Sequence, residues 1–341
     1  MSIYKIRVLM ALAVILPVSV CPLVWAETQP LKKALESISV SEQNQDSYKL
    51  SAGEIEKLID AGKCKAASKA FKRLKTDFPE IIKPDSNDLD LLIGAEILLC
   101  KGKLDKAARQ YDKLLDEIPT GSRFYLPALE RQFEIATAFL AGAKKPVLRI
   151  FKIKGYAEGV RIMEDIGYRL ALDDPYGMGL QAELAVAKSY QARKKYDEAF
   201  YRWAQIKDKH QNDELGKEAL LAMADCKLAM YKGPDYDNSD LNGRPLNPSS
   251  FYESAKSCYE EFRLKYPQDI EKYNIEEKIK DLDETLASKQ FKIGQYYQGT
   301  GNKLSANLYF QMVVNRWPDT VTAKIAGQML IQNTGRQEKA E

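Results

Sequence analysis

Histidine is almost absent from this sequence, which holds one copy, His210, in 341 residues. Histidine-dependent acid–base catalysis or a multi-histidine metal site would have to rest on that residue alone, so we expect it at a surface or helix-end position. The sequence also lacks the HExxH, GxxxxGK[ST] and GxSxG motifs of metalloproteases, phosphate-binding loops and serine hydrolases. We therefore predict a non-catalytic protein that needs no cofactor and no metal.

Strong charge of one sign and closely spaced cysteines are lacking as well. The net charge is +3, too near neutrality for a surface that wraps nucleic acid, and no CxxC pair indicates a zinc or redox site. Beyond residue 26 the cysteines are Cys64, Cys100, Cys226 and Cys258. Buried free thiols are the leading interpretation. If a disulfide forms, Cys226 with Cys258 is the pair to test, because both are expected on helices of one repeat.

Long apolar runs are confined to the amino terminus. Lys5 and Arg7 precede an apolar run over residues 8–20, and small residues at Val24 and Ala26 fit signal-peptidase cleavage. We predict a signal peptide over residues 1–26, whose removal lowers the net charge to +1 because it takes away two positive charges and no negative ones. An uncleaved membrane anchor is the alternative, but thirteen apolar residues are fewer than the ~20 that span a bilayer. No transmembrane segment is expected after cleavage.

Cys21 raises the question of a lipid anchor. Lipid-attachment signals place a small residue directly before the cysteine, whereas Val20 stands there. We therefore expect cleavage after Ala26 and no lipidation.

A frame with an alanine, an aromatic residue four positions later and a proline eight positions after that recurs along the chain. In "SANLYFQMVVNRWPDT" it consists of Ala306, Phe310 and Pro318. A small residue lets two helices cross closely, the aromatic fills the gap beside it, and proline ends the helix. The predicted packing residues are Ala67, Phe71, Ala107, Tyr111, Ala199, Trp203, Ala255, Tyr259, Ala306 and Phe310. They resemble the tetratricopeptide repeat, a helix-turn-helix unit of about 34 residues.

The spacing predicts an all-α fold, a tetratricopeptide-repeat right-handed superhelical solenoid over residues 49–332 with about six helix pairs and a closing helix. Gly62, Gly102 and Gly301 precede second helices, where a residue that tolerates positive φ is needed. We expect a flexible leader over 27–48 and a disordered tail over 333–341. The predicted pairs are 51–61 with 63–77, 87–100 with 103–117, 124–141 with 156–173, 178–192 with 196–209, 214–231 with 250–265, and 275–298 with 302–316, before a closing helix over 319–332.

Two of these pairs are interrupted by longer connections. In the third pair "GAKKPVLRIFKIKG", Gly142 to Gly155, is a basic and apolar loop, and in the fifth pair residues 232–249 form a turn-rich excursion. We predict a partner contact in the first of these loops, through Arg149, Phe151 and Lys152. The alternative is that its apolar residues pack over neighbouring helices.

The stretch from Ala219 to Ala326 resembles a known family. It contains "LAMYKGPDYD", "ESAKSCYEEFRLKYPQD" and "FKIGQYYQGTGNKLSANLYFQMVVNRWPDTVTAKIA". Together they are similar to the BamD-like outer-membrane-protein assembly factors, over about 214–326. This resemblance implies a periplasmic repeat scaffold, peripheral to the outer membrane, that docks on a membrane barrel protein and helps deliver unfolded barrel precursors. It implies no particular partner-contact residue.

The leading hypothesis is thus a scaffold that binds protein or peptide segments on the surface of its repeats. An accessory protein of an envelope enzyme and a purely structural periplasmic spacer are the alternatives. An enzyme would need buried carboxylates that converge in a cleft. A spacer would have no reproducible partner.

Overall fold

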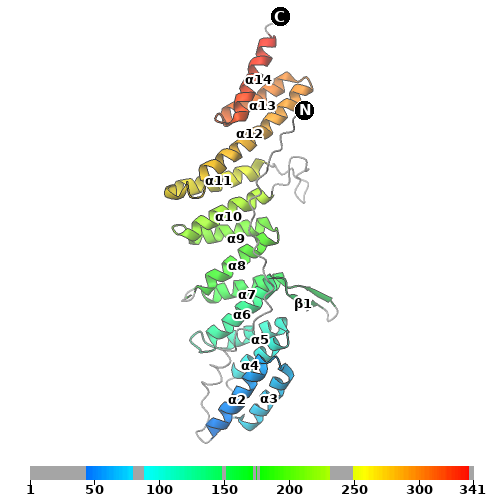
Figure 1. Cartoon of the computed structure of the whole chain (residues 1–341), viewed down its shortest axis with the longest axis vertical. Helices are drawn as coiled ribbons and strands as arrows, with labels where there is room; N and C mark the ends of the chain where they lie inside the picture. Colours follow the sequence, from blue (N-terminus) through cyan, green and yellow to red (C-terminus); the bar gives the residue numbers. More distant parts are fainter. Residues whose placement is uncertain are drawn as a thin grey trace. The chain divides into compact units, whose positions relative to one another are not determined.

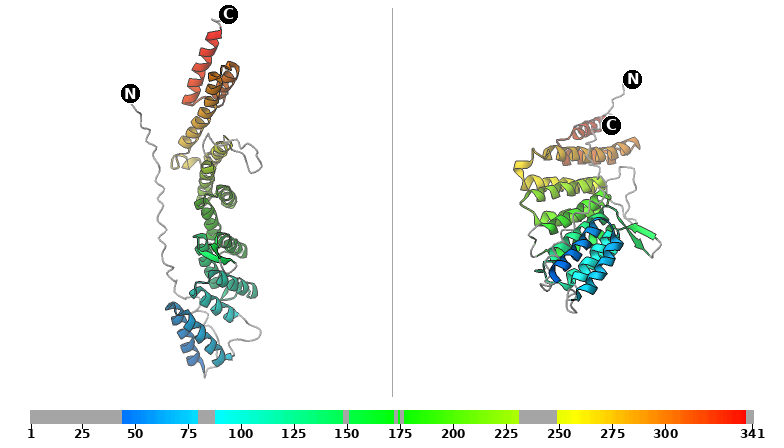
Figure 2. Two further views of the ribbon diagram at one scale, coloured as in Figure 1. Left: turned by 90° about the vertical axis from the view of Figure 1, so that its right-hand side faces the viewer. Right: turned by 60° about the horizontal axis from the view of Figure 1, so that its bottom comes forward.

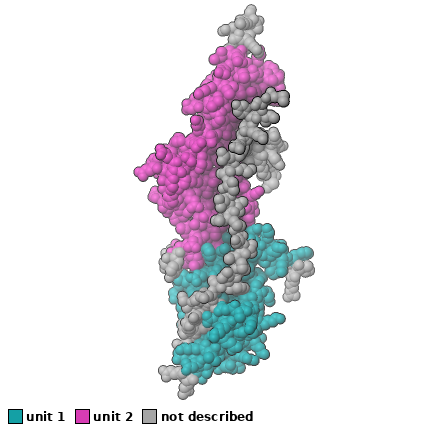
Figure 3. All heavy atoms as spheres, in the orientation of Figure 1, with its two compact units in different colours: residues 1–162 teal, residues 163–341 magenta. Residues whose placement is uncertain are grey.

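The computed structural model describes residues 44–79, 88–147, 151–171, 174, 177–230 and 249–337. Over these residues the chain is all-α apart from one short β-hairpin (Figure 1). It forms two compact units, Met1–Ile162 and Met163–Glu341 (Figure 3). The predicted signal peptide, the leader up to residue 43 and residues 231–248 lie outside the described residues.

Both units are built from successive helices that pack side by side (Figures 1 and 2). The first unit contains α2 (Gln45–Asp60), α3 (Cys64–Asp77), α4 (Asp88–Cys100), α5 (Leu104–Glu117), α6 (Tyr125–Leu140), β1 (Lys144–Val147), β2 (Phe151–Lys154) and the start of α7 (Tyr156–Arg169). The second contains the rest of α7, then α8 (Met178–Ala192), α9 (Tyr196–Lys209), α10 (Glu214–Met230), α11 (Ser249–Lys265), the 3₁₀ turn η3 (Pro267–Asp269), α12 (Ile275–Gly299), α13 (Lys303–Arg316) and α14 (Val321–Gln337). The predicted tetratricopeptide-type array of six helix pairs and a closing helix is confirmed.

The largest differences from the predicted bounds lie at the two ends of the array. Helix α2 begins at Gln45, inside the expected leader, because the Tyr48 ring is buried edge-on against Phe78 with 5.6 Å between ring centroids. Helix α14 continues to Gln337, into the expected tail. There the buried Asn333 side chain donates to Asn307 Oδ1 at 2.6 Å. Both extensions depend on contacts with residues of neighbouring helices, and such contacts cannot be predicted from the local sequence pattern.

All ten predicted packing residues are buried. The close approach is clearest in the last pair, where a Cβ atom placed on Gly294 of α12 would lie 2.6 Å from the Phe310 ring of α13. Glycine at this position therefore lets the ring pack directly against the backbone of α12. Phe310 also lies against Phe291, with 5.2 Å between the ring centroids.

The proline of the repeated frame follows each helix end by two residues. The residue between helix and proline is apolar and buried: Phe78, Ile118, Tyr266 and Trp317. Its N–H donates to a carbonyl four residues earlier, and its backbone then leaves the helical region, as expected before proline. This arrangement ends four of the second helices and adds a buried side chain to the core each time.

One turn geometry ends the first helices of five pairs. A residue with positive φ donates its N–H three residues back, and the next residue donates five residues back, which is a Schellman motif. Glycine holds the positive-φ position at Gly62, Gly102, Gly142 and Gly301, with φ of 67°, 65°, 98° and 82°. In the fourth pair Lys194 holds it, with φ of 60°. A side chain at such a position is strained because its Cβ crowds the backbone.

We therefore expect Lys194→Gly to raise the free energy of unfolding of the second unit by about 1 kcal/mol. The reverse change at the equivalent turn, Gly301→Lys, should lower it by a similar amount. Trp203 and Trp317 both lie in this unit, so tryptophan fluorescence in urea measures its stability. Unchanged or lower stability in Lys194→Gly would mean that the turn has a different conformation in solution.

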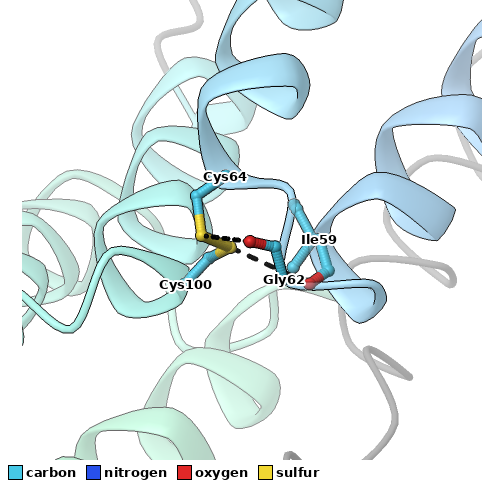
Figure 4. Close-up of a disulfide and its surroundings, with 4 residues drawn as sticks. All are labelled: Ile59, Gly62, Cys64 and Cys100. Carbon is cyan, nitrogen blue, oxygen red and sulfur yellow. Dashed lines mark hydrogen bonds between the residues drawn. A yellow bond between two sulfur atoms is a disulfide. The ribbon is translucent and has the colours of Figure 1, made fainter.

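A disulfide joins the first two of these turns. Cys64 is the first residue of α3 and Cys100 is the last residue of α4, with 5.6 Å between their Cα atoms. Their sulfur atoms lie against backbone carbonyls of the first turn, at 3.2 Å from Gly62 O and 3.8 Å from Ile59 O (Figure 4). The prediction of free thiols is thus wrong for this pair.

The other two cysteines agree with that prediction. Cys226 of α10 and Cys258 of α11 are free and buried, and burial raises the pKa of each thiol to about 11. The suggested disulfide between these two residues is not formed in the structure.

A buried charge network connects α4, α5 and α6. Glu96 is 2% exposed, and its Oε1 accepts from the Tyr111 hydroxyl at 2.7 Å and from Arg131 Nε at 3.0 Å. Arg131, also buried, donates in addition to Glu134 at the surface, at 2.8 Å. Burial holds the pKa of Glu96 above its ordinary value, although Arg131 and Tyr111 act in the opposite direction. The first unit therefore contains a buried ion pair in which the loss of one partner would leave the other charge without compensation.

Candidate interaction site

The connection inside the third helix pair is a β-hairpin, whereas the sequence indicated a loop. Strands β1 and β2 pair antiparallel, with Lys144 opposite Lys154 and Val147 opposite Phe151. Residues 148–150, including the predicted contact residue Arg149, lie outside the described residues. The hairpin projects from α6 and α7 in Figures 1 and 2.

The hairpin is inserted at a turn that is otherwise complete. Helix α6 ends in the same Schellman motif as the other first helices, with Gly142 N–H donating to Phe139 O and Ala143 N–H donating to Ala138 O. Gly155 then closes the base, because its N–H donates to Ala143 O at 2.8 Å. A Cβ atom on Gly155 would lie 2.2 Å from the Phe139 ring, so glycine is required there.

The two faces of the hairpin differ in chemistry. Successive residues of a strand point to opposite faces, and directly paired residues point to the same face. Phe151 and Ile153 therefore share one face, where they are 65% and 50% exposed. Lys152 and Lys154 lie on the other face, opposite Pro146 and Lys144. Lys145 shares the face of Phe151 and Ile153 because it is paired with Ile153, but its charge is engaged by Glu158. The hairpin thus has one face with two exposed apolar side chains and one with exposed lysines, which we call the apolar face and the lysine face.

Ion pairs hold the base of the hairpin on the helices. Lys145 Nζ of β1 lies 2.9 Å from Glu158 of α7, which also accepts from Arg161. Arg161 in turn pairs with Asp112 of α5 at 2.9 Å. Burial alone would raise the pKa of Glu158, but the hydrogen bonds from Lys145 and Arg161 outweigh it and lower that pKa. Lys145 is thus neutralised, whereas the other lysines of the hairpin are exposed.

The structure separates the residues that the sequence grouped into one contact. Phe151 and Lys152 are both exposed but lie on opposite faces of β2, so one flat partner surface cannot cover both. The alternative of packing over neighbouring helices does not hold for Phe151 or Ile153, given their exposure. The prediction missed Ile153 and Lys154, although the alternation in "FKIK" was a signal for a strand with two different faces.

A shallow depression of about 280 Å³ lies within the second unit, between α7, α8 and α9. Its two carboxylates are ion-paired, Glu164 with Arg202 and Glu183 with Lys209. The lone histidine is nearby at the C-cap of α9, where His210 Nδ1 lies 2.8 Å from Asp213. Asp213 accepts from two backbone N–H groups at the start of α10. His210 therefore has the helix-end position that was predicted.

Among the described residues, no group of three or more histidine, cysteine, aspartate or glutamate side chains is placed so that it could hold a metal ion. None of the described helices combines the length and apolar character that a membrane span requires.

No protein-family model matches the sequence, and no curated protein matches it. Among solved structures the chain is similar to the human IFIT1 dimer with m7Gppp-AAAA, at 13% sequence identity and a TM-score of 0.23, over 88% of this chain and 76% of that chain. A likeness this weak carries no argument. The repeated turns, the buried packing residues and the consecutive helix pairs themselves make this chain an all-α protein of tetratricopeptide-repeat type.

Proposed function

We propose that this chain is an exported, non-catalytic repeat scaffold that binds protein segments, with the apolar face of its hairpin as a contact surface. The exposure of Phe151 and Ile153 on a two-stranded hairpin carries the proposal. Exposed aromatic and branched side chains on a projecting element lose water-accessible area only when a partner covers them. Ion pairs at the base hold the hairpin in place, which limits the entropy lost on binding.

Export is supported by two independent features. The amino terminus has the pattern of a signal peptide, and the Cys64–Cys100 disulfide suits an oxidising compartment, because cytosolic thiols are kept reduced. The resemblance of residues 219–326 to the BamD-like family gives the scaffold a narrower role. In this role it works in the periplasm beside the outer membrane, where it binds a barrel protein or its unfolded precursor.

Site-specific photocrosslinking in cells tests this function. A photoreactive residue at position 151 should give a reproducible adduct with one envelope protein. The same residue at position 201, which is equally exposed on α9, should not. An adduct with a barrel-assembly component supports the BamD-like role. An adduct with an envelope enzyme would instead indicate an accessory protein of that enzyme. If position 151 gives no reproducible adduct, the hairpin is not a contact surface.

Variants of the two faces serve as matched controls. The pair Phe151→Ser and Ile153→Ser should reduce partner capture at least 10-fold, because exposed apolar anchors dominate such contacts. The pair Lys152→Ser and Lys154→Ser should have a smaller effect that disappears at high salt. Both double variants should keep the thermal unfolding temperature of the parent. Equal partner capture by the parent and both double variants would contradict the assignment of the apolar face as the contact surface.

A further inference from the structure

The second helices of the pairs share a set of four outer positions. These positions lie two residues before the repeat alanine and two, five and nine residues after it, so they follow one face of each helix; in α7 Gly159 stands where the other helices have the alanine. They hold Lys65, Lys69, Lys72 and Thr76 in α3; Asp105, Arg109, Asp112 and Asp116 in α5; Ala157, Arg161, Glu164 and Tyr168 in α7; Asp197, Tyr201, Ala204 and Asp208 in α9; and Glu253, Ser257, Glu260 and Leu264 in α11. Each of these five faces carries at least two charged side chains.

Helix α13 departs from this pattern. Its four positions hold Leu304, Leu308, Gln311 and Asn315, none of which is charged, and the two leucines are 85% and 64% exposed. A terminal repeat ordinarily needs a polar outer face to stay soluble. The α13 face, defined by these four residues, thus combines two exposed leucines with two uncharged amides.

The charged side chains around this face favour a negatively charged partner. Neither α13 nor α14 contains an acidic residue; Asp319 lies in the turn between them, and Glu284 of α12 is occupied by hydrogen bonds from Val321 N and Thr322 N at the start of α14. Lys303 at the start of α13 and Lys324 of α14 are both exposed. Arg316 is 3.7 Å from Glu253 and so is partly neutralised. A partner that supplies carboxylates gains energy here, whereas a partner with basic groups is repelled.

We infer that the α13 face binds an acidic amphipathic helix of another protein. Leucines four residues apart form a ridge that fits between the side chains of a second helix. The face spans Leu304 to Asn315, about 16 Å at 1.5 Å per residue, which matches three turns of a partner helix. Carboxylates beside the apolar stripe of that helix would meet Lys303 and Lys324. This contact is separate from the hairpin and goes beyond the proposed function.

A second copy of the same chain is a poorer occupant. The four side chains of the α13 face offer the same area to either occupant, so charge decides between them. A symmetric pair would bring the lysines of one copy toward those of the other, with no acidic group in either α13 or α14 to offset them.

Fluorescence anisotropy with designed peptides tests this inference on the full mature chain. The probe is a labelled 18-residue amphipathic helix with leucines at positions i, i+3, i+4 and i+7 and glutamates on its flanks. We expect saturable binding that weakens at least 10-fold in the variant Leu304→Ser with Leu308→Ser. Binding should also weaken as salt rises, since exposed charges are screened. A peptide with the same leucines and lysine flanks should bind at least 10-fold more weakly.

Further controls distinguish the α13 face from the hairpin and from self-association. Tyr201→Ser changes the equivalent position of α9 and should leave peptide binding unaltered. The hairpin variants should also bind the peptide normally, so a failure of the proposed function would not affect this result. Equal binding of both peptides, equal binding to the leucine variant, or a dimer in analytical ultracentrifugation that the variant disperses would each overturn the inference.

Discussion

Glu96→Ala is expected to lower the free energy of unfolding of the first unit by about 3 to 5 kcal/mol. The change leaves Arg131 buried without the carboxylate that accepts from its Nε, and it also removes the acceptor of the Tyr111 hydroxyl. A buried charge without its partner pays its full desolvation cost, whereas an intact pair roughly cancels that cost. The large effect therefore comes from the Arg131 charge and the Tyr111 hydroxyl, which stay buried after the Glu96 carboxylate is lost.

Two probes can assign this loss to the right unit. The first unit contains no tryptophan after residue 25, whereas Trp203 and Trp317 lie in the second. Unfolding in urea followed by far-UV circular dichroism should therefore shift strongly in Glu96→Ala, and tryptophan fluorescence should shift much less. If both signals keep the parent midpoint, the ion pair does not form in solution.

Three variants at the same network separate charge from packing. Glu134→Ala removes the exposed partner of Arg131 and should cost less than about 1 kcal/mol. Glu96→Gln keeps an acceptor oxygen without the charge and should lie between the parent and Glu96→Ala. The double variant Glu96→Met with Arg131→Met removes both charges and should recover most of the loss.

Phe310→Ala should destabilise the second unit by about 3 to 5 kcal/mol, because the ring is fully buried between α12 and α13. Tryptophan fluorescence in urea measures this change, with Trp317 in the same apolar cluster as Phe310. Phe151→Ala, the same substitution at an exposed ring, should change stability by less than about 0.5 kcal/mol. A loss below about 1 kcal/mol in Phe310→Ala would mean that the helices have a different register.

Gly294 provides a stricter test of the same contact. Gly294→Ala alone should cost about 1 to 3 kcal/mol, since its new methyl group would overlap the Phe310 ring. In the double variant with Phe310→Ala that overlap is absent, and the methyl group occupies part of the cavity. The double variant should therefore lose clearly less stability than the two single changes together.

The repeated frame was sufficient to predict the helix pairs. Ala199 and Trp203 placed the fourth pair at its observed bounds even though Gln211 stands in place of the proline. Short-range packing explains this success, because a small residue and an aromatic one turn apart specify where two helices cross. Gly62, Gly102 and Gly301 likewise predicted the turns, since backbone conformation there depends on one residue.

Contacts between neighbouring repeats were harder to predict. Cys64 and Cys100 are 36 residues apart, which is close to the length of one repeat, and residues one repeat apart lie beside each other. That spacing was the signal for the disulfide. Glu96 had a signal as well, because it is the only charged residue between Asp90 and Cys100. The rest of residues 91–100 of α4 is apolar and mostly buried, so the Glu96 charge requires a partner on another helix.

The candidate hairpin site was predicted only in part. The prediction located the projecting segment and two of its exposed residues, Phe151 and Lys152. It placed both residues in one contact, although they lie on opposite faces of the hairpin. Adjacent residues of a strand point to opposite faces in any register, so the error came from treating residues 151–154 as a loop and not as a strand. The α13 face was missed because Leu304 and Leu308 have ordinary helical spacing, and only comparison with the other second helices makes them unusual.

The closed base of the hairpin has a consequence for how this chain can change over time. Because Ala143 and Gly155 are joined by a backbone hydrogen bond, the eleven residues between them enter and leave the array at one point. Helices α6 and α7 would need no rearrangement if that segment were exchanged, shortened or lost. The chain between α10 and α11 is lengthened at the corresponding position of its own pair. Turns within pairs are thus positions where a new binding segment can be inserted while the helix pairs themselves stay unchanged.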